Sequence, residues 1–469
     1  MIMSSWRADP MRAHWTRTQS PTRKFQVTPD APPKPAGRLS KADESRIPNP
    51  QSLIPIPGLS SRIVPLHPAL RRVASALTYR DFRVLWMGAF ASSIGTWMQK
   101  VAQSWLVLTL TDSAFYLGLD AFLGELPILL FTLVGGVVAD RRDRRTVLLI
   151  SQCVQLGTAF ALAALVYWDA VRVWHILTLS CVTGTAQAFG GPAYQSLLPT
   201  LVRRDDMPNA IALNSTQFNL ARVIGPLLAG VALATLGSAA CFALNGLSFL
   251  FVIASLLMLH IRHVAVVPTQ SMAGEMRSGL SFVRHDPVIL TMTFLALCTT
   301  LLAAPVLTLL PVMARDVFAL GPAGYSRLMA FSGAGAVLGA LTVAWLGRFP
   351  AMGRVVLLVQ LALGIVLAAF GASRILPLSY ALIFVGSIGL MMSFSLLTSL
   401  VQLAAPNEMR GRVVSIYMMA FRGGMPLGSL AAGYAANLTS APATMVATGL
   451  LLSVVAAAFL ARAKAVRRF

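Results

Sequence analysis

Long apolar runs follow one another from about residue 82 to residue 461, and short turns containing Gly, Pro, Asp or Arg separate them. A helix needs about 20 apolar residues to cross a bilayer. The runs are long enough for twelve such helices, which we expect at 82–108, 114–139, 145–168, 173–194, 208–234, 239–261, 288–312, 325–347, 353–371, 376–400, 412–437 and 441–461. The pattern therefore predicts an all-α membrane protein with twelve transmembrane helices.

The composition supports the same class. The 469-residue chain is 56% hydrophobic and 12% charged, with a mean hydropathy of +0.70, whereas soluble domains carry about 25% charged residues. A net charge of +21 would suggest nucleic acid as the partner of a soluble protein. Here the Lys and Arg residues lie mainly between the apolar runs, so we expect them to contact anionic lipid head groups of the bilayer, and we expect no nucleic-acid partner.

The loops differ in positive charge. The even-numbered loops and the C-terminus contain Arg141, Arg142, Arg144, Arg145, Arg203, Arg204, Arg262, Arg277, Arg284, Arg348, Arg354, Arg410, Arg412, Arg462, Lys464, Arg467 and Arg468. The odd-numbered loops contain only Arg172, Arg315, Arg327 and Arg374. Because cytoplasmic loops of membrane proteins are enriched in Lys and Arg, we expect both termini to lie in the cytoplasm.

The chain contains an internal repeat. The stretch that begins at Ser196 matches the stretch that begins at Ser399, at an offset of about 203 residues. The matched pairs are Asp205 with Glu408, Phe218 with Phe421, Gly225 with Gly428 and Gly230 with Gly433. Parallel repeats of this kind predict two pseudo-symmetric six-helix halves with the binding site between them. We place the halves at 79–261 and 288–469, and a cytoplasmic connector at 262–287.

Residues 1–78 differ from the rest of the chain. They are rich in Pro, Arg and Lys and show no apolar period. Such a segment cannot bury enough apolar surface to offset the entropy of ordering it. We expect it to be a disordered cytoplasmic segment, and the alternative is that part of it reflects an early start codon.

The loop after the second predicted helix is GGVVADRRDRRTVLL, residues 135–149. Asp140 stands where it can cap the next helix or pair with an arginine. The loop resembles the signature of the major facilitator superfamily, in which it latches the two halves together. The resemblance implies a latch made of Gly136, Asp140, Arg141, Arg144 and Arg145. The alternative is an ordinary basic turn, and the equivalent region from Gly339 has no Asp.

The fifth predicted helix contains ARVIGPLLAG, residues 221–230. Gly225 and Pro226 are expected to interrupt the backbone hydrogen bonds and to kink the helix. With Gly230, they are similar to the fifth-helix signature of antiporters in the same superfamily, which implies export. Ala221 and Ala229 stand where that signature often has glycine.

A longer resemblance covers about residues 75–460 and includes DFRVLWMGAFASSIGTWMQKVAQSWLVL in the first predicted helix. Together with ADRRDRR and PAYQSLLPTLV, it resembles the bacterial enterobactin-exporter-like branch of the superfamily. This resemblance implies a monomer in the bacterial inner membrane. A related branch moves lysophospholipids, so the substrate stays open.

Ionisable residues inside membrane helices are candidates for function because they are costly to bury. With a rise of about 1.5 Å per residue, Lys100, Glu125 and Arg222 are expected in one layer near the middle of the membrane. Asp120 is expected nearer the outer surface, where water can solvate it. A carboxylate that alternates between a cation and water could couple transport to protons. The alternative is a permanent ion pair between two helices.

Polar and aromatic residues on four predicted helices could line the substrate path. The candidates are Gln99, Gln103, Gln187, Asn214, Gln217, Asn219, Tyr417 and Arg422. Trp97 and Trp105 could stack on a substrate or lie at a lipid boundary.

The sequence has no GxxxxGK[ST] phosphate loop and no HExxH metal motif. We therefore expect neither cofactor nor metal nor enzymatic activity, and energy must come from a gradient. The hypothesis is a secondary active transporter that exports an amphiphilic small molecule, such as a siderophore or drug, in exchange for protons by alternating access. The alternative is a lysophospholipid flippase or transporter of the same fold.

Overall fold

The computed structural model describes residues 75–259 and 272–463. The predicted disorder of 1–74 and part of the predicted connector, 260–271, lie outside these residues. Ser75–Thr78, at the end of the segment expected to be disordered, form the 3-10 helix η2. Ala76 is fully buried beside Phe82 and Leu85, and Asn209 Nδ2 donates to Ser75 Oγ at 2.6 Å. These contacts hold η2 against α2 and α6, ahead of the first long helix.

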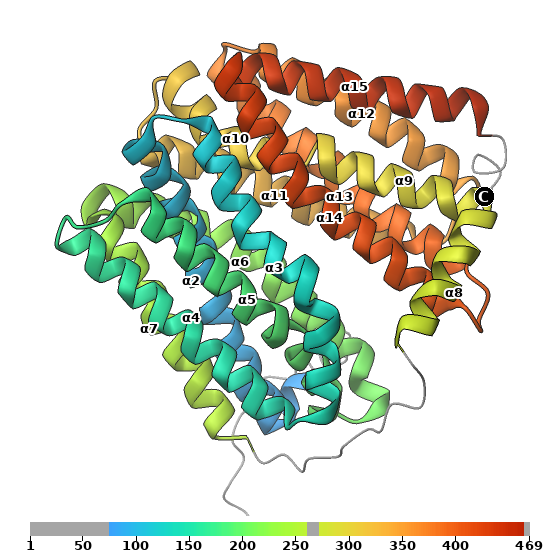
Figure 1. Ribbon diagram of the computed structural model, residues 1–469, viewed down its shortest axis with the longest axis horizontal. Helices are drawn as coiled ribbons and strands as arrows, with labels where there is room; N and C mark the ends of the chain where they lie inside the picture. Colours follow the sequence, from blue (N-terminus) through green and yellow to red (C-terminus); the bar gives the residue numbers. More distant parts are fainter. Residues whose placement is uncertain (1–74, 260–271, 464–469) are drawn as a thin grey trace, which may run out of the picture. The chain divides into compact units, whose positions relative to one another are not determined.

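The first half contains six long helices, at the places that the apolar runs predict (Figure 1). They are α2 (Arg80–Thr111), α3 (Ala114–Arg141), α4 (Arg144–Tyr167), α5 (Val173–Leu197), α6 (Met207–Thr235) and α7 (Gly237–Leu257). The 3-10 helices η3 (Leu198–Leu201) and η4 (Arg204–Asp206) connect α5 to α6.

The second half begins with α8 (Met272–His285), which lies in the predicted connector and packs against α14 and α9. The further elements are α9 (Pro287–Leu302), α10 (Val306–Val312), the π-helical turn η5 (Met313–Val317), α11 (Pro322–Leu346), α12 (Met352–Ala372), α13 (Leu376–Ala404), α14 (Arg410–Leu438) and α15 (Ala441–Arg462). The predicted span at 288–312 falls within the apolar segment Pro287–Val317, which is long enough to cross a membrane and which a turn at 303–305 divides into α9 and α10. Pro305 has no backbone N–H to donate, which favours a break there.

Nine helical segments within 75–259 and 272–463 are long and apolar enough to cross a membrane. The helices α2, α5 and α14 have 32, 25 and 29 residues but are more polar. At about 1.5 Å per residue each of them has the length to cross a bilayer. The twelve-crossing count therefore remains a prediction for these three helices.

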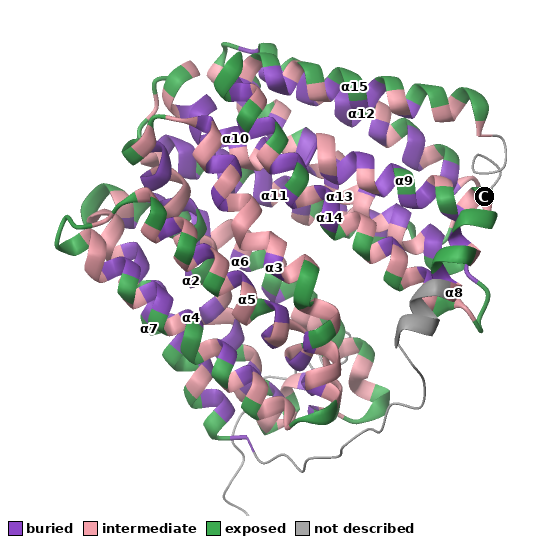
Figure 2. Ribbon diagram, in the orientation of Figure 1, coloured by how far each residue is buried: buried purple, intermediate pink, exposed green. Residues whose placement is uncertain are grey.

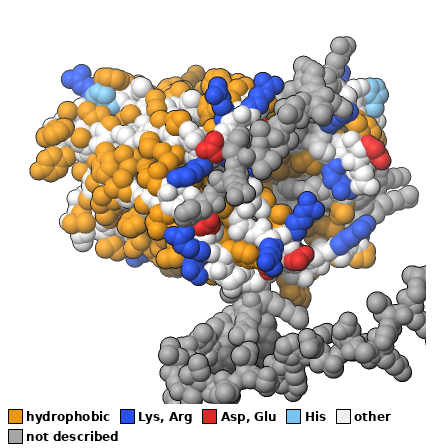
Figure 3. All heavy atoms as spheres, turned by 90° about the horizontal axis from the view of Figure 1, so that it is seen from below, with side chains coloured by type: hydrophobic (Ala, Val, Ile, Leu, Met, Phe, Trp, Pro, Cys, Tyr) orange, Lys and Arg blue, Asp and Glu red, His pale blue; other side chains and the backbone are white. Residues whose placement is uncertain are grey.

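The outward faces of peripheral helices carry apolar side chains. On α15, Leu450, Leu451 and Val454 are more than half exposed, and on α7 Phe251 is 64% exposed. Figure 2 shows exposed residues along α7 and α15, and Figure 3 shows the hydrophobic surface. Figure 3 also shows Lys and Arg side chains at the end seen from below. An apolar belt with a charged end is what a membrane-embedded bundle requires.

Helices pack in the same order in the two halves. The corresponding pairs are α2–α6 with α9–α14, α3–α5 with α11–α13, and α4–α7 with α12–α15. Two seams join the halves, α3 with α14 and α6 with α11, and they correspond to each other under the sequence repeat. At the seams Gly118 packs on the backbone of Ser429, and Gly333 packs on the backbone of Arg222. Small residues at these positions allow the helices to approach closely.

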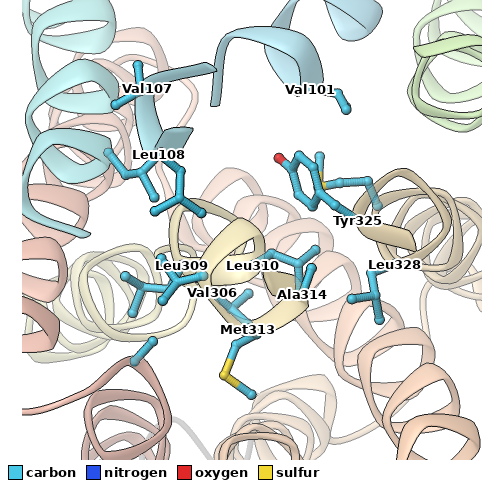
Figure 4. Packing of buried hydrophobic residues seen from close by; sticks show 14 of the residues in the cluster. Val101, Val107, Leu108, Val306, Leu309, Leu310, Met313, Ala314, Tyr325 and Leu328 are labelled. Carbon is cyan, nitrogen blue, oxygen red and sulfur yellow. The ribbon is translucent and has the colours of Figure 1, made fainter. Parts of the chain in front are cut away.

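The halves are in close contact at one end of the bundle. This end lies opposite the even-numbered loops, which carry most of the arginines and which we call the Arg-rich loops. In Figure 4, Val101, Val107 and Leu108 of α2 lie near Leu310 of α10 and Tyr325 of α11. All five are fully or almost fully buried in one hydrophobic cluster. This cluster, which we call the end seal, closes one end of the interface between the halves.

Polar contacts reinforce the end seal. Arg315 forms an ion pair with Asp112 and donates to the Leu108 carbonyl at 3.3 Å. Ser113 Oγ donates to Asn437 Oδ1 at 2.8 Å. All of these residues lie at or near the helix ends that are farthest from the Arg-rich loops. The contacts therefore hold the two halves together at that end.

Candidate functional site

Four side chains meet in the middle of the bundle, and we call them the central cluster: Trp97, Lys100, Glu125 and Arg222. Lys100 Nζ lies 3.7 Å from Glu125 Oε1, which joins α2 to α3. Lys100 Nζ also lies 5.4 Å from the centroid of the Trp97 ring, and Arg222 Cζ lies 5.5 Å from the same centroid. Both distances are within the range of cation–π interactions.

The Lys100–Glu125 pair is loose. Its 3.7 Å separation is longer than a hydrogen bond, and the two side chains are 58% and 30% exposed. Ion pairs with this exposure contribute little stability. Among the described residues Arg222 contacts no carboxylate, so the structure does not place Arg222 as a partner of Glu125. The arrangement leaves both Lys100 and Glu125 accessible to other partners.

Asp120 is the more deeply buried carboxylate of α3, with 8% exposure. Gln103 Nε2 donates to both of its oxygens, at 2.8 and 3.0 Å, and Ser180 Oγ donates at 2.5 Å. The expectation that water can solvate Asp120 is therefore wrong. The reason is the rotation of α3, which turns Asp120 toward α2 and α5.

Two residues predicted to line the path instead connect helices within the first half. Gln99 accepts from Asn245 Nδ2 of α7 at 2.6 Å and lies 3.5 Å from Gln103. We call Asn245, Gln99, Gln103, Asp120 and Ser180 the polar network. It spans α7, α2, α3 and α5, so Gln99 and Gln103 support the packing of the half.

The other predicted path residues have different surroundings. Tyr417 is fully buried, with its hydroxyl 3.0 Å from Thr398 Oγ1, so it does not line an open path in this structure. Asn214 accepts from the Tyr194 hydroxyl at 2.7 Å, and Asn219 donates to the Ser215 carbonyl at 2.8 Å.

Gln217 is buried, and its Oε1 has no hydrogen-bond partner among the described residues. Gln187 and Arg422 are exposed. Gln187 and Arg422 therefore keep polar groups that a substrate or water could engage, whereas Gln217 Oε1 is closed off from solvent in this structure.

In the predicted latch loop, the structure gives Asp140 a different place from the one expected from the sequence. Helix α3 continues through Asp140 and ends at Arg141, and Asp143 caps α4 by accepting from the Arg145 and Thr146 amides at 3.3 and 3.1 Å. Asp140 therefore does not cap the next helix, and it forms no ion pair with a described residue. Sequence could have indicated the cap, because Asp directly before a helical run is a favoured N-cap.

The arginines of this loop donate hydrogen bonds to backbone carbonyls of the first half. Arg144 Nη1 donates to the Ser196 carbonyl at 3.1 Å, and Arg145 Nη2 donates to the Leu257 carbonyl at 2.9 Å. Arg141 is exposed, and Gly136 has open space where a side chain would lie. In this structure the loop contacts are consistent with a latch that is not engaged.

The glycines of the fifth-helix motif lie at two helix contacts. A side chain at Gly225 would collide with Trp97 and the Ile94 carbonyl of α2, and one at Gly230 would collide with Ser326 of α11. Helix α6 stays continuous through Pro226. The motif therefore fits α6 against the central cluster on one side and against the second half on the other.

Two halves with corresponding helix contacts, with charged and amide side chains between and within them, are the arrangement expected of a membrane transporter whose binding site lies between the halves. Residues 73–467 match the model of the transmembrane secretion effector family of the major facilitator superfamily, and the chain belongs to this family.

Characterised relatives and a solved structure agree with this class. The chain is 29% identical to the multidrug efflux pump Tap of Mycolicibacterium fortuitum, over 80% of this chain and 94% of the pump. It is 26% identical to the staphyloferrin A transporter of Staphylococcus aureus, over 73% of this chain and 86% of the relative. A bacterial homologue of the human lysosomal transporter Spinster, in an inward-facing and unoccupied conformation, matches with a TM-score of 0.65 and 14% identity, over 84% of this chain and 98% of that chain. The last match shows a shared major facilitator fold.

Proposed function

We propose that this protein exports an amphiphilic small molecule, such as a drug or a siderophore, across the bacterial inner membrane by alternating access. The family and the named activities of the two relatives support export. The Arg-rich loops support an orientation with both termini in the cytoplasm. The repeated packing supports halves at 79–261 and 288–469, joined by the segment 262–287.

The observation that carries the proposal is the end seal together with the central cluster. The halves are locked at the end opposite the Arg-rich loops, and the charged side chains lie below that seal. In the proposed orientation the sealed end faces outward, so the central cluster is reached from the cytoplasm. An exporter loads its substrate from that side. The latch of Gly136, Asp140, Arg141, Arg144 and Arg145 would engage in the opposite state.

Proton exchange would use Glu125. Its carboxylate is held loosely by Lys100 and is 30% exposed, so a proton can reach it without breaking a tight hydrogen bond. Protonation would remove the attraction for Lys100 and change the charge of the central cluster. Asp120 is the second candidate, but its three donated hydrogen bonds favour a structural role. A monomer is sufficient for this cycle, because both halves are in one chain.

The test is substrate efflux from proteoliposomes with and without an imposed pH gradient. We expect the gradient to accelerate export by wild type and to have no effect on Glu125→Gln, which cannot ionise. Asp169→Asn is the matched control, because Asp169 is exposed in a loop with φ of 54° and Asn tolerates that conformation. An equal gradient response of wild type and Glu125→Gln would refute the role of Glu125.

A further inference from the structure

Two arginines between the halves lack an anionic partner. Arg222 on α6 is partly buried, and its guanidinium lies over the Trp97 ring. Arg422 on α14 is exposed. Within 75–259 and 272–463, neither guanidinium has a carboxylate within ion-pair distance or a hydrogen-bond acceptor. A guanidinium has five N–H donors, so both side chains keep their full donor capacity for another molecule.

The helix register places Arg422 at the depth of the central cluster. On the α3–α14 seam, Gly118 packs on Ser429. Helix α3 runs toward the Arg-rich end and α14 runs away from it. Glu125 follows Gly118 by seven residues, and Arg422 precedes Ser429 by seven. Seven residues are about two turns, or about 10 Å, so both side chains lie two turns below the same contact and on the same faces as Gly118 and Ser429.

The charges in this layer do not balance. Lys100, Arg222 and Arg422 are cationic, and Glu125 is anionic, which leaves an excess of two positive charges. Asp120 is hydrogen-bonded by Gln103 and Ser180 but still carries a negative charge that acts on Lys100, so the excess is one positive charge when Asp120 is counted. An excess charge inside a membrane is costly unless it is hydrated or paired. An anionic ligand would lower that cost, and a cationic ligand would raise it.

Aromatic rings lie beside the cations. Phe218 meets Trp97 edge to face, with 6.2 Å between ring centroids, and Phe218 is 54% exposed. Phe218 and Arg222 are four residues apart on α6, so they share one face of that helix. A ligand that pairs with Arg222 would therefore place its nearest apolar part against these rings.

We propose that the central site takes an anionic amphiphile, with a carboxylate or similar group bound to Arg222 and a planar apolar part against Trp97 and Phe218. Arg422 adds attraction from the second half. A carboxylate fits the planar fork of a guanidinium through two parallel hydrogen bonds. The inference rests on the proposed export function and adds the charge of the substrate to it.

The test compares two dyes with the same xanthene ring system: fluorescein, an anion at a pH where it is ionised, and rhodamine 6G, a cation. Binding to the purified protein is measured by fluorescence anisotropy, and transport is measured in proteoliposomes. We expect wild type to prefer fluorescein. Arg222→Gln should weaken fluorescein binding about tenfold to a hundredfold, the range for losing a charged hydrogen-bond donor pair. Arg422→Gln should weaken it less, since that side chain is more exposed.

Two control variants test whether a loss of fluorescein binding is specific to the Arg222 side chain. Arg327→Gln removes an exposed arginine of α11 near the end seal and should leave fluorescein binding unchanged. Arg222→Lys keeps the charge but loses the planar fork, so it should bind fluorescein more weakly than wild type and more tightly than Arg222→Gln. A monodisperse elution profile of Arg222→Gln on size exclusion would show that its loss of binding is not misfolding.

The outcomes separate the inference from the export function. Transport of rhodamine 6G but not fluorescein would refute the anionic site and leave export standing. Equal binding of both dyes, or fluorescein binding that Arg222→Gln does not change, would also refute the site, as would no binding of fluorescein. Fluorescein binding without transport of either dye would support the site and count against export.

Discussion

Replacing Asp120 should destabilise the protein, because the carboxylate organises the polar network inside the first half. Asp120→Ala leaves the Ser180 hydroxyl without its acceptor, in a place where the carboxylate itself is only 8% exposed, whereas the Gln103 amide keeps Ser180 Oγ as an acceptor at 2.9 Å. A buried donor left unsatisfied costs about 1–3 kcal/mol. One such donor, the Ser180 hydroxyl, gives an expected loss of about 1–3 kcal/mol. Asp120→Asn keeps one acceptor oxygen and should lose less.

The assay is thermal unfolding of the purified protein. The measured quantity is the fraction of protein that remains monodisperse after heating. A double-mutant cycle with Ser180→Ala sharpens it. Ser180 donates to Asp120 and accepts from Gln103, so the second substitution should cost less once Asp120 is absent, and the coupling should be about 0.5–3 kcal/mol. Asp169→Asn is the control for a lost carboxylate outside the network.

Two results would refute this reasoning. Wild-type stability of Asp120→Ala would show that the polar network does not hold the first half together. Wild-type stability of Asp120→Asn combined with loss of the response to a pH gradient would show that Asp120, and not Glu125, exchanges the proton.

Two further predictions concern the contact between the halves. Gly118→Leu should reduce transport at least about tenfold, because the leucine side chain would collide with the Ser429 backbone at the α3–α14 seam. The control Gly157→Leu on α4 faces open space and should be tolerated. Normal turnover of Gly118→Leu at matched protein levels would contradict the close seam. Asp140→Asn should slow transport strongly in the same flux assay while the amount of protein in the membrane stays unchanged, as expected for a latch that acts only in the opposite state. Unaltered flux would leave Asp140 as an ordinary residue of the last turn of α3, and Asp169→Asn again serves as the control.

The positions of the helices follow from the sequence almost completely. A segment that crosses a bilayer must satisfy its own backbone hydrogen bonds and be apolar over about 20 residues. Both requirements are local, so apolar runs mark each long helix. The break between α9 and α10 is also local, and Pro305 was its available signal. The depth of Lys100 and Glu125 could be estimated as well, because depth depends only on the number of residues and the rise per residue.

The direction of each side chain around its helix axis was decided by the tertiary structure. In a soluble protein the polar face of a helix marks its solvent side, but lipid and protein interior are both apolar, so a membrane helix lacks that guide. Sequence therefore could not tell that Asp120 turns toward Gln103 and Ser180 while Glu125 turns toward Lys100. It also could not tell that Tyr417 is buried among helices of its own half. Which neighbour packs on which face is a property of the whole bundle, and that packing alone separates the buried polar network from the residues left open to a substrate.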